Sequence, residues 1–280
     1  LPARATRDRE RFLTDVRTPA ALTSVAGTAV LGTRLAILGW QWAGVALLVI
    51  ALVVWAALLV PVLTHWRTPT AGASLLLTVS TESLAVLAAT LAAPEHARWL
   101  LFAALGPFAL GLVFYVFVIA RFDPRQLGVG RGDHWITGGA LAISTLAAAR
   151  ITLGAKALAV LGNGGGALKG LSLGLWVLTM LWLPVLVLVE VLHPRLRYNV
   201  RRWSTVFPVG MYAVCSFVIG IAVHAGAITS FARLWVWVAL AVWALISAAL
   251  VGRVLTVIGG EHPPSPHRSG DITPSGHGAV

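Results

Sequence analysis

The chain has 280 residues, of which 58% are hydrophobic and only 11% are charged, and its mean hydropathy is +0.85. A soluble domain carries roughly 25% charged residues, so this composition excludes an ordinary water-soluble protein. The net charge of +11 does not indicate nucleic-acid binding, because the basic residues lie between long apolar runs. The single cysteine, Cys215, excludes an internal disulfide and a cysteine metal cluster.

The apolar runs predict eight membrane-spanning helices, because a helix needs roughly 20 residues to cross the hydrocarbon core. In chain order the predicted spans are 19–38, 41–64, 74–93, 98–120, 134–153, 170–192, 204–227 and 231–257. Lipid offers no partner for backbone polar groups, so we expect an all-α integral membrane fold of helical hairpins. Residues 1–18 are expected to form a cytoplasmic N-terminal arm, 19–257 the transmembrane domain and 258–280 a disordered cytoplasmic tail.

The distribution of Lys and Arg between the two sides of the membrane predicts the orientation of the chain. Fifteen of the 21 Lys and Arg residues lie on the side that holds both termini. The other six are Arg34, Arg98, Arg150, Lys156, Lys169 and Arg233. Because cytoplasmic loops carry the excess of positive charge, we expect a multi-pass protein of the cell (plasma) membrane with both termini in the cytoplasm.

Two kinds of predicted helix alternate along the chain. Gly, Ala, Ser and Thr make up close to half of spans 19–38, 74–93, 134–153 and 204–227, but a third or less of the other four. Small residues let helices approach closely or leave room for a conduit, whereas bulky residues and Trp suit a lipid-facing surface. The pattern predicts inner small-residue helices around a pore and outer bulky helices facing lipid. The alternative is that the small residues serve close packing alone.

Four stretches in the small-residue spans resemble the tellurite-resistance/C4-dicarboxylate transporter family, which includes plant slow anion channels and fungal malate and sulfite transporters. They are Val25–Gly32, Leu76–Leu87, Asp133–Ile143 and Trp203–Ala213, within a likeness that extends from about residue 11 to residue 257. The resemblance implies ten helices in five hairpins, a central pore lined by the odd-numbered helices, and a homotrimer as the expected assembly. By this comparison the chain lacks the first hairpin, which would leave the inner ring open on one side.

Phe207 and Pro208 are the candidate pore gate. A proline inside span 204–227 removes a backbone hydrogen bond and predicts a kink. The resemblance implies that a phenylalanine of this helix projects into the pore, and Phe207 is the best match. The alternative is an ordinary packed Phe beside a proline.

Glu82 lies near the middle of span 74–93, where a charged carboxylate costs roughly 2.5–3.5 kcal/mol on insertion scales. It should therefore face the interior, be protonated or pair with a cation. It is a candidate for proton coupling, or alternatively a structural group bonded to Thr81, Ser83 or a neighbouring helix. The polar and small residues expected to line the pore with it are Thr81, Ser83, Thr137, Gly138 and Ser144.

Arg34 and Arg150 lie near the non-cytoplasmic ends of two inner spans, where they could concentrate anions at a pore mouth. The alternative is that both side chains snorkel to the interface. The glycine-rich run before Lys169 is not a phosphate-binding P-loop, because Leu168 and Gly170 flank the lysine where Gly and Ser/Thr are required.

The sequence thus predicts transport of a small inorganic or organic anion (of the dicarboxylate, tellurite, sulfite or halide/nitrate class) across a lipid bilayer, with no cofactor, no metal site and no nucleic-acid partner. A non-transporting fragment or subunit of such a transporter is the alternative. An intramembrane enzyme is a weaker hypothesis, because only Glu82 is a deeply placed carboxylate and catalysis needs a converging cluster.

Overall fold

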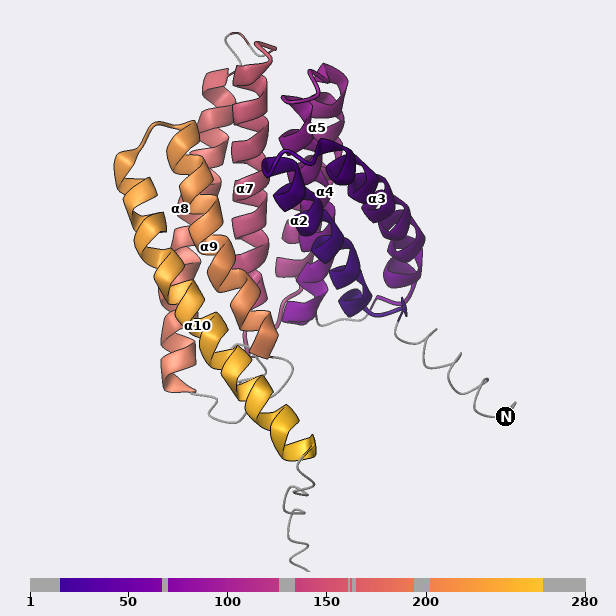
Figure 1. Cartoon of the computed structure of the whole chain (residues 1–280). Helices are drawn as coiled ribbons and strands as arrows, with labels where there is room; N and C mark the ends of the chain where they lie inside the picture. Colours follow the sequence, from indigo (N-terminus) through magenta and orange to yellow (C-terminus); the bar gives the residue numbers. More distant parts are fainter. Residues whose placement is uncertain are drawn as a thin grey trace, which may run out of the picture.

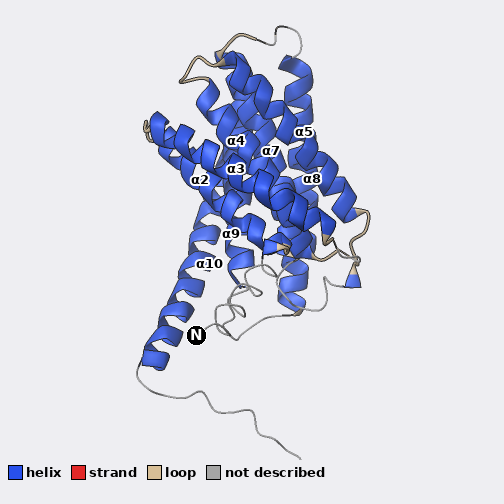
Figure 2. Ribbon diagram, turned by 90° about the vertical axis from the view of Figure 1, so that its right-hand side faces the viewer, coloured by secondary structure: helices blue, strands red, loops and turns tan. Residues whose placement is uncertain are grey.

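The computed structural model describes residues 16–66, 70–125, 134–160, 162, 165–193 and 202–258. In this part of the chain, eight helices are long and apolar enough to cross a membrane (Figures 1 and 2), which confirms the predicted all-α fold. They are α2 (Thr23–Ile37, extended by η1 at Pro19–Leu22), α3 (Gln41–Thr64), α4 (Leu76–Ala92, extended by η2 at Gly72–Leu75), α5 (Arg98–Ile119), α7 (Trp135–Ala157), α8 (Gly165–Leu192), α9 (Trp203–Ala222) and α10 (Gly226–Ile258). Most of the predicted arm and tail lies outside the described residues.

The predicted alternation of inner and outer helices is confirmed by burial. The share of residues that are buried inside the protein is 33% in the span of α2, 89% in the spans of α4 and α7, and 61% in the span of α9. It is only 11% for α3, 22% for α5, 17% for α8 and 6% for α10. The strong contrast between α9 and α10 exceeds what their similar content of small residues suggests, because burial depends on neighbours as well as composition.

The four inner helices form an arc. Helix α2 packs on α4, α4 on α7, and α7 on α9, while no comparable contact joins α9 back to α2 (Figure 1). Each inner helix also packs on the outer helix that follows it in sequence: α2 on α3, α4 on α5, α7 on α8 and α9 on α10. The helices at the two ends of the arc are therefore the less buried of the inner set, since each has a side that no described helix covers.

The turns at one end of the bundle share a single backbone design. Gly39, His96, Ala159 and His224 each follow an inner helix with a positive φ of 91°, 50°, 50° and 59°. After each, the next N–H bonds to a carbonyl five residues earlier, as in Ala225 to Gly220 at 2.8 Å. This is the Schellman ending of a helix. It places the α9–α10 turn at residues 223–225, earlier than the predicted boundary between 227 and 231, because His224 takes the left-handed conformation without being a glycine.

Tryptophans of the outer helices do not all face lipid. The indole N–H of Trp55 in α3 donates to Thr81 Oγ1 at 2.9 Å, and that of Trp176 in α8 donates to Ser216 Oγ at 2.9 Å. Trp235 in α10 donates to the Val209 carbonyl at 3.1 Å. The lipid-facing interpretation fits Trp237, which is 69% exposed, but Trp55, Trp176 and Trp235 hold outer helices to inner ones.

Candidate functional site

Glu82 is fully buried within α4, and its side chain points toward an outer helix. A Cβ atom placed at Gly111 of α5 would lie 2.7 Å from Glu82 Oε1, so only a glycine leaves room for the carboxyl there. Neither carboxyl oxygen has a hydrogen-bond partner among the described residues. The flanking hydroxyls bond to their own helix instead: Thr81 donates to Leu77 O at 2.8 Å and Ser83 to Ser80 O at 2.7 Å.

The Ser144 hydroxyl of α7 lies beside this carboxyl. It donates to the Ala140 carbonyl at 3.1 Å, and rotation about its C–O bond could turn the proton toward Glu82. Three helices, α4, α5 and α7, therefore enclose one carboxyl, with the Ser144 hydroxyl beside it. Because an unpaired charge at membrane depth is costly, such a site suits a carboxyl that binds a proton or gains a partner when the helices move.

The contact between α7 and α9 surrounds Pro208. A Cβ at Gly139 would lie 2.9 Å from Pro208 Cβ, and a Cβ at Gly138 would collide with the Tyr212 hydroxyl. The glycine pair thus lets the proline-containing turn of α9 approach α7 closely. Gly138, predicted to line the pore, is covered by this contact.

Phe207 lies on an exposed stripe of α9. Its side chain is 36% exposed, and Val214, Phe217 and Ile221 follow on the same side of the helix. None of the described helices closes over the ring, so the ring does not close a constriction in this part of the chain. Pro208, its neighbour, is buried on the opposite side against α7.

The other predicted pore-lining residues are buried. Thr81, Thr137 and Ser144 are 0% exposed and Ser83 is 2% exposed. Thr137 donates to the His134 carbonyl. Because α4 and α7 expose almost no surface along their length, no open lumen passes these residues within the part of the chain that the structure describes. The structure places Glu82 and Phe207 in different helix contacts and does not bring them together.

The two predicted pore-mouth arginines differ in their surroundings. Arg34 is exposed near the end of α2, as expected of either interpretation. Arg150 is partly buried in α7, and its Nε has no hydrogen-bond partner among the described residues. Arg150 is thus the more sheltered of the two cations.

Sequence reasoning missed the hydroxyl pairs that join α7 to α8. Thr145 Oγ1 lies 3.0 Å from Thr179 Oγ1, and Thr152 Oγ1 lies 3.1 Å from Ser172 Oγ. Both helices carry these hydroxyls seven residues apart, which is two helical turns, so an antiparallel pair brings both sets into register. This seven-residue spacing in both helices is the sequence feature that could have predicted the two hydroxyl pairs.

Comparisons with known proteins decide the family. A sequence model of the voltage-dependent anion channel family (SLAC1) matches residues 2–251. The chain belongs to the voltage-dependent anion channel family. This is the family that the four small-residue stretches predicted, and it is a family of channels and transporters rather than of enzymes.

Curated relatives of this anion channel family member add little about substrate. An uncharacterized membrane protein of Mycobacterium tuberculosis (strain CDC 1551 / Oshkosh) is 36% identical over 132 residues, and so is one of strain ATCC 25618 / H37Rv. Each match covers 45% of this chain and 66% of the relative. No solved structure gives a significant match.

Proposed function

We propose that this protein carries a small anion across the cell membrane along its inner helices. The observation that carries the proposal is the family match across residues 2–251, over a chain whose inner and outer helices alternate. The anion belongs to the dicarboxylate, tellurite, sulfite or halide/nitrate class that the resemblance implies. Hydroxyls and helix dipoles can pass such anions without holding them too tightly to leave.

In this proposal Phe207 is the gate and Glu82 couples the anion to a proton. Phe207 can act as a gate only when a further surface lies opposite its ring, because the ring is exposed in the described part of the chain. Helices α4 and α7 must shift before an anion can pass the polar side chains proposed to line the pore, because these side chains are buried. They are Thr81, Ser83, Thr137 and Ser144. Arg34 and Arg150 would then raise the local anion concentration at one end.

A second candidate function is a non-transporting fragment or subunit of such a transporter. The observation that favours it is the open arc: α2 and α9 do not pack on each other, and both expose apolar side chains such as Leu31 and Phe217. Transport would then need a further transmembrane element between these two helices, supplied in the same chain, by another copy in a homotrimer or by a partner.

Reconstitution separates the two functions. The purified chain in liposomes should take up at least one of labelled malate, sulfite, nitrate or chloride faster than protein-free liposomes do. Circular dichroism and tryptophan fluorescence of the same sample establish that the helices are folded. A folded protein that carries none of these anions contradicts autonomous transport and supports the fragment or subunit.

A further inference from the structure

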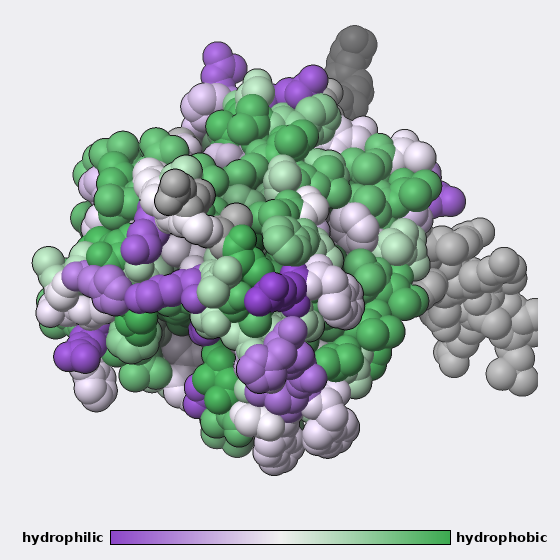
Figure 3. Space-filling model, turned by 90° about the horizontal axis from the view of Figure 1, so that it is seen from above, coloured by the Kyte–Doolittle hydropathy of each residue, from purple (hydrophilic) through white to green (hydrophobic). Residues whose placement is uncertain are grey.

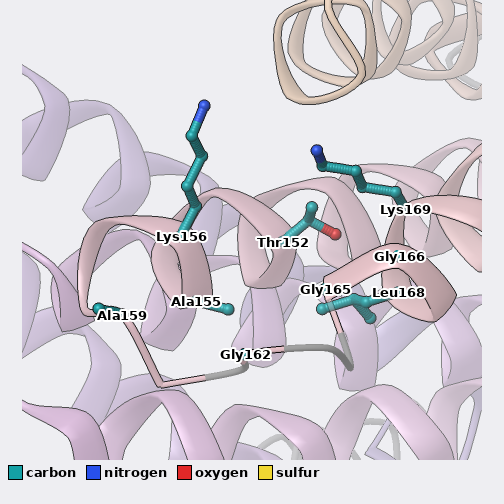
Figure 4. Close-up of a pocket in the computed structure, with 9 residues that line it drawn as sticks. All are labelled: Thr152, Ala155, Lys156, Ala159, Gly162, Gly165, Gly166, Leu168 and Lys169. Carbon is teal, nitrogen blue, oxygen red and sulfur yellow. The ribbon is translucent and has the colours of Figure 1, made fainter.

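Two lysines on neighbouring helices share one pocket at the end of the bundle that the charge distribution predicts to be non-cytoplasmic. The pocket has a volume of about 390 Å³ and lies where α7 ends and α8 begins. Lys156 is in the last turn of α7 and Lys169 is in the second turn of α8. In Figure 4 both side chains extend to the same side of the pocket, with Thr152 between them.

Neither lysine of this pocket has a salt-bridge partner in the described part of the chain. No Asp or Glu described there lies within 4.0 Å of either lysine, and the nearest contact of this kind on the same two helices joins His134 Nε2 to Glu190 Oε2 at 3.6 Å, at their other end. Seen from above in Figure 3, this end of the molecule carries separate hydrophilic side chains that stand among apolar ones. Two ammonium groups over one hollow, without a carboxylate, attract an anion.

A third helix positions one of the lysines. Lys156 Nζ lies 3.2 Å from Nε2 of His224, the residue that ends α9 in the left-handed conformation. An ammonium can only donate, so in this contact the Lys156 ammonium donates to the ring nitrogen of His224. His224 is therefore a positioning residue that directs Lys156, while Lys169 keeps its donors available within the described residues.

The remaining lining of the pocket leaves space for a ligand and brings no further charged side chain. A Cβ at Gly165 or Gly166 would meet no atom within 4 Å, so the hollow beside the start of α8 is open. The Thr152 hydroxyl already donates to Ala148 O at 2.8 Å and faces Ser172 Oγ. The two ammonium groups are thus the charged groups that a ligand would meet, beside the first backbone N–H groups of α8.

We propose that this pocket binds a phosphate-type oxyanion between Lys156 and Lys169. Ammonium groups are point charges that donate to separate oxygens of such a group from two directions. The oxyanion is either free in solution or the headgroup phosphate of an anionic lipid, because the pocket lies at the helix ends, where headgroups are. Binding at this pocket does not depend on transport, so the site stands or falls separately from the proposed function.

Equilibrium dialysis of the full chain in neutral detergent against radiolabelled inorganic phosphate tests the free-anion form. Lys156→Gln and Lys169→Gln should each weaken binding about five-fold, which is the effect expected of one basic residue on an anionic group at a membrane surface. Lys156→Arg should retain binding. Arg98→Gln is the matched control, because Arg98 is an exposed cation at the same end that does not line the pocket.

Native mass spectrometry tests the lipid form. After extraction from vesicles of phosphatidylglycerol and phosphatidylcholine, the wild type should retain phosphatidylglycerol that the Lys156→Gln/Lys169→Gln double variant loses. Displacement of that lipid by excess phosphate assigns the site to a free oxyanion, and resistance to displacement assigns it to the headgroup. If the folded double variant binds both probes as well as the wild type, or if the wild type binds neither, the proposal is overturned.

Discussion

At the scale of the residue, Phe207 combines two properties that a gate needs. Its ring is exposed on α9, and its backbone is adjacent to a proline that is clamped against α7. A ring on a rigid turn can narrow a conduit without moving its own helix. Apolar constrictions of this kind close a pore by excluding water.

We therefore expect Phe207→Ala to increase anion flux into proteoliposomes several-fold, because removing the ring of the proposed gate widens the conduit. Phe217→Ala is the control, since Phe217 lies on the same stripe with a similar exposure of 42% but has no neighbouring proline. Equal flux from wild type and a well-folded Phe207→Ala variant would identify Phe207 as a packing residue.

Glu82 distinguishes a channel from a proton-coupled carrier. Its carboxyl is buried against Gly111 without a hydrogen-bond partner among the described residues, and the only hydroxyl found beside it there is Ser144. An anion that moves together with a proton crosses with less net charge, so the membrane potential opposes it less. A pore without coupling has little need of an acid at this depth.

We expect anion uptake by the wild type to rise when a pH gradient is imposed, and Glu82→Gln to abolish this dependence while the protein remains in the membrane. Uptake measured with and without the gradient, for both proteins, is the readout. Ser144→Ala should weaken the dependence less, because it removes a neighbour and not the proton carrier. A wild type that ignores the gradient would leave Glu82 as a structural residue of a channel.

At the scale of the element, the contact between α7 and α9 depends on the absence of a side chain. Gly139 faces Pro208 so closely that any Cβ forces one helix to shift. Overpacking of this kind typically costs about 1–3 kcal/mol. The same two helices carry the candidate gate and the Ser144 hydroxyl, so the contact also sets where those groups lie.

Gly139→Val should lower the midpoint of thermal unfolding, followed by tryptophan fluorescence in detergent, by several degrees. Gly174→Ala in α8 is the matched control, because a Cβ there meets no atom within 4 Å. The control should leave the midpoint unchanged or raise it slightly, since alanine favours helix more than glycine does. A Gly139→Val protein as stable as the wild type would show that the two helices separate easily.

At the scale of the whole molecule, the even number of spans among the described residues, eight, places the two ends of the helical domain on one side. In Figure 1 the start of α2 and the end of α10 lie at the same end of the bundle. The excess of Lys and Arg, fifteen against six, predicts that this end is cytoplasmic.

Cysteine labelling in intact cells tests this orientation on a Cys215→Ala background, since Cys215 is the only native thiol and is buried. A membrane-impermeant maleimide should label Ala157→Cys, at the end of α7, without permeabilisation. It should label His65→Cys, which is exposed at the end of α3, only after permeabilisation. The reverse pattern would mean that the charge rule misassigns this protein.

The sequence by itself determined the class, the number of spans, the alternation of inner and outer helices and the family. The first three features follow from local composition, because a bilayer forces every long apolar run to be a helix and sorts helices by the side chains they present. The family rests instead on the resemblance of particular stretches, such as Trp203–Ala213. The high content of Gly, Ala, Ser and Thr in spans 19–38, 74–93, 134–153 and 204–227 was enough to predict which helices are inner.

Only the tertiary structure decided where individual side chains point. Composition could not show that the Glu82 side chain points toward Gly111 or that the Trp55 indole bonds to an inner helix. It also could not show that Trp176 bonds to α9, or that His224 after α9 contacts Lys156 at the end of α7. Each of these contacts joins residues far apart in the chain. The physical reason is that a helix presents its side chains in all directions around its axis, and the helix that packs against each side decides whether a residue is buried, paired or left open.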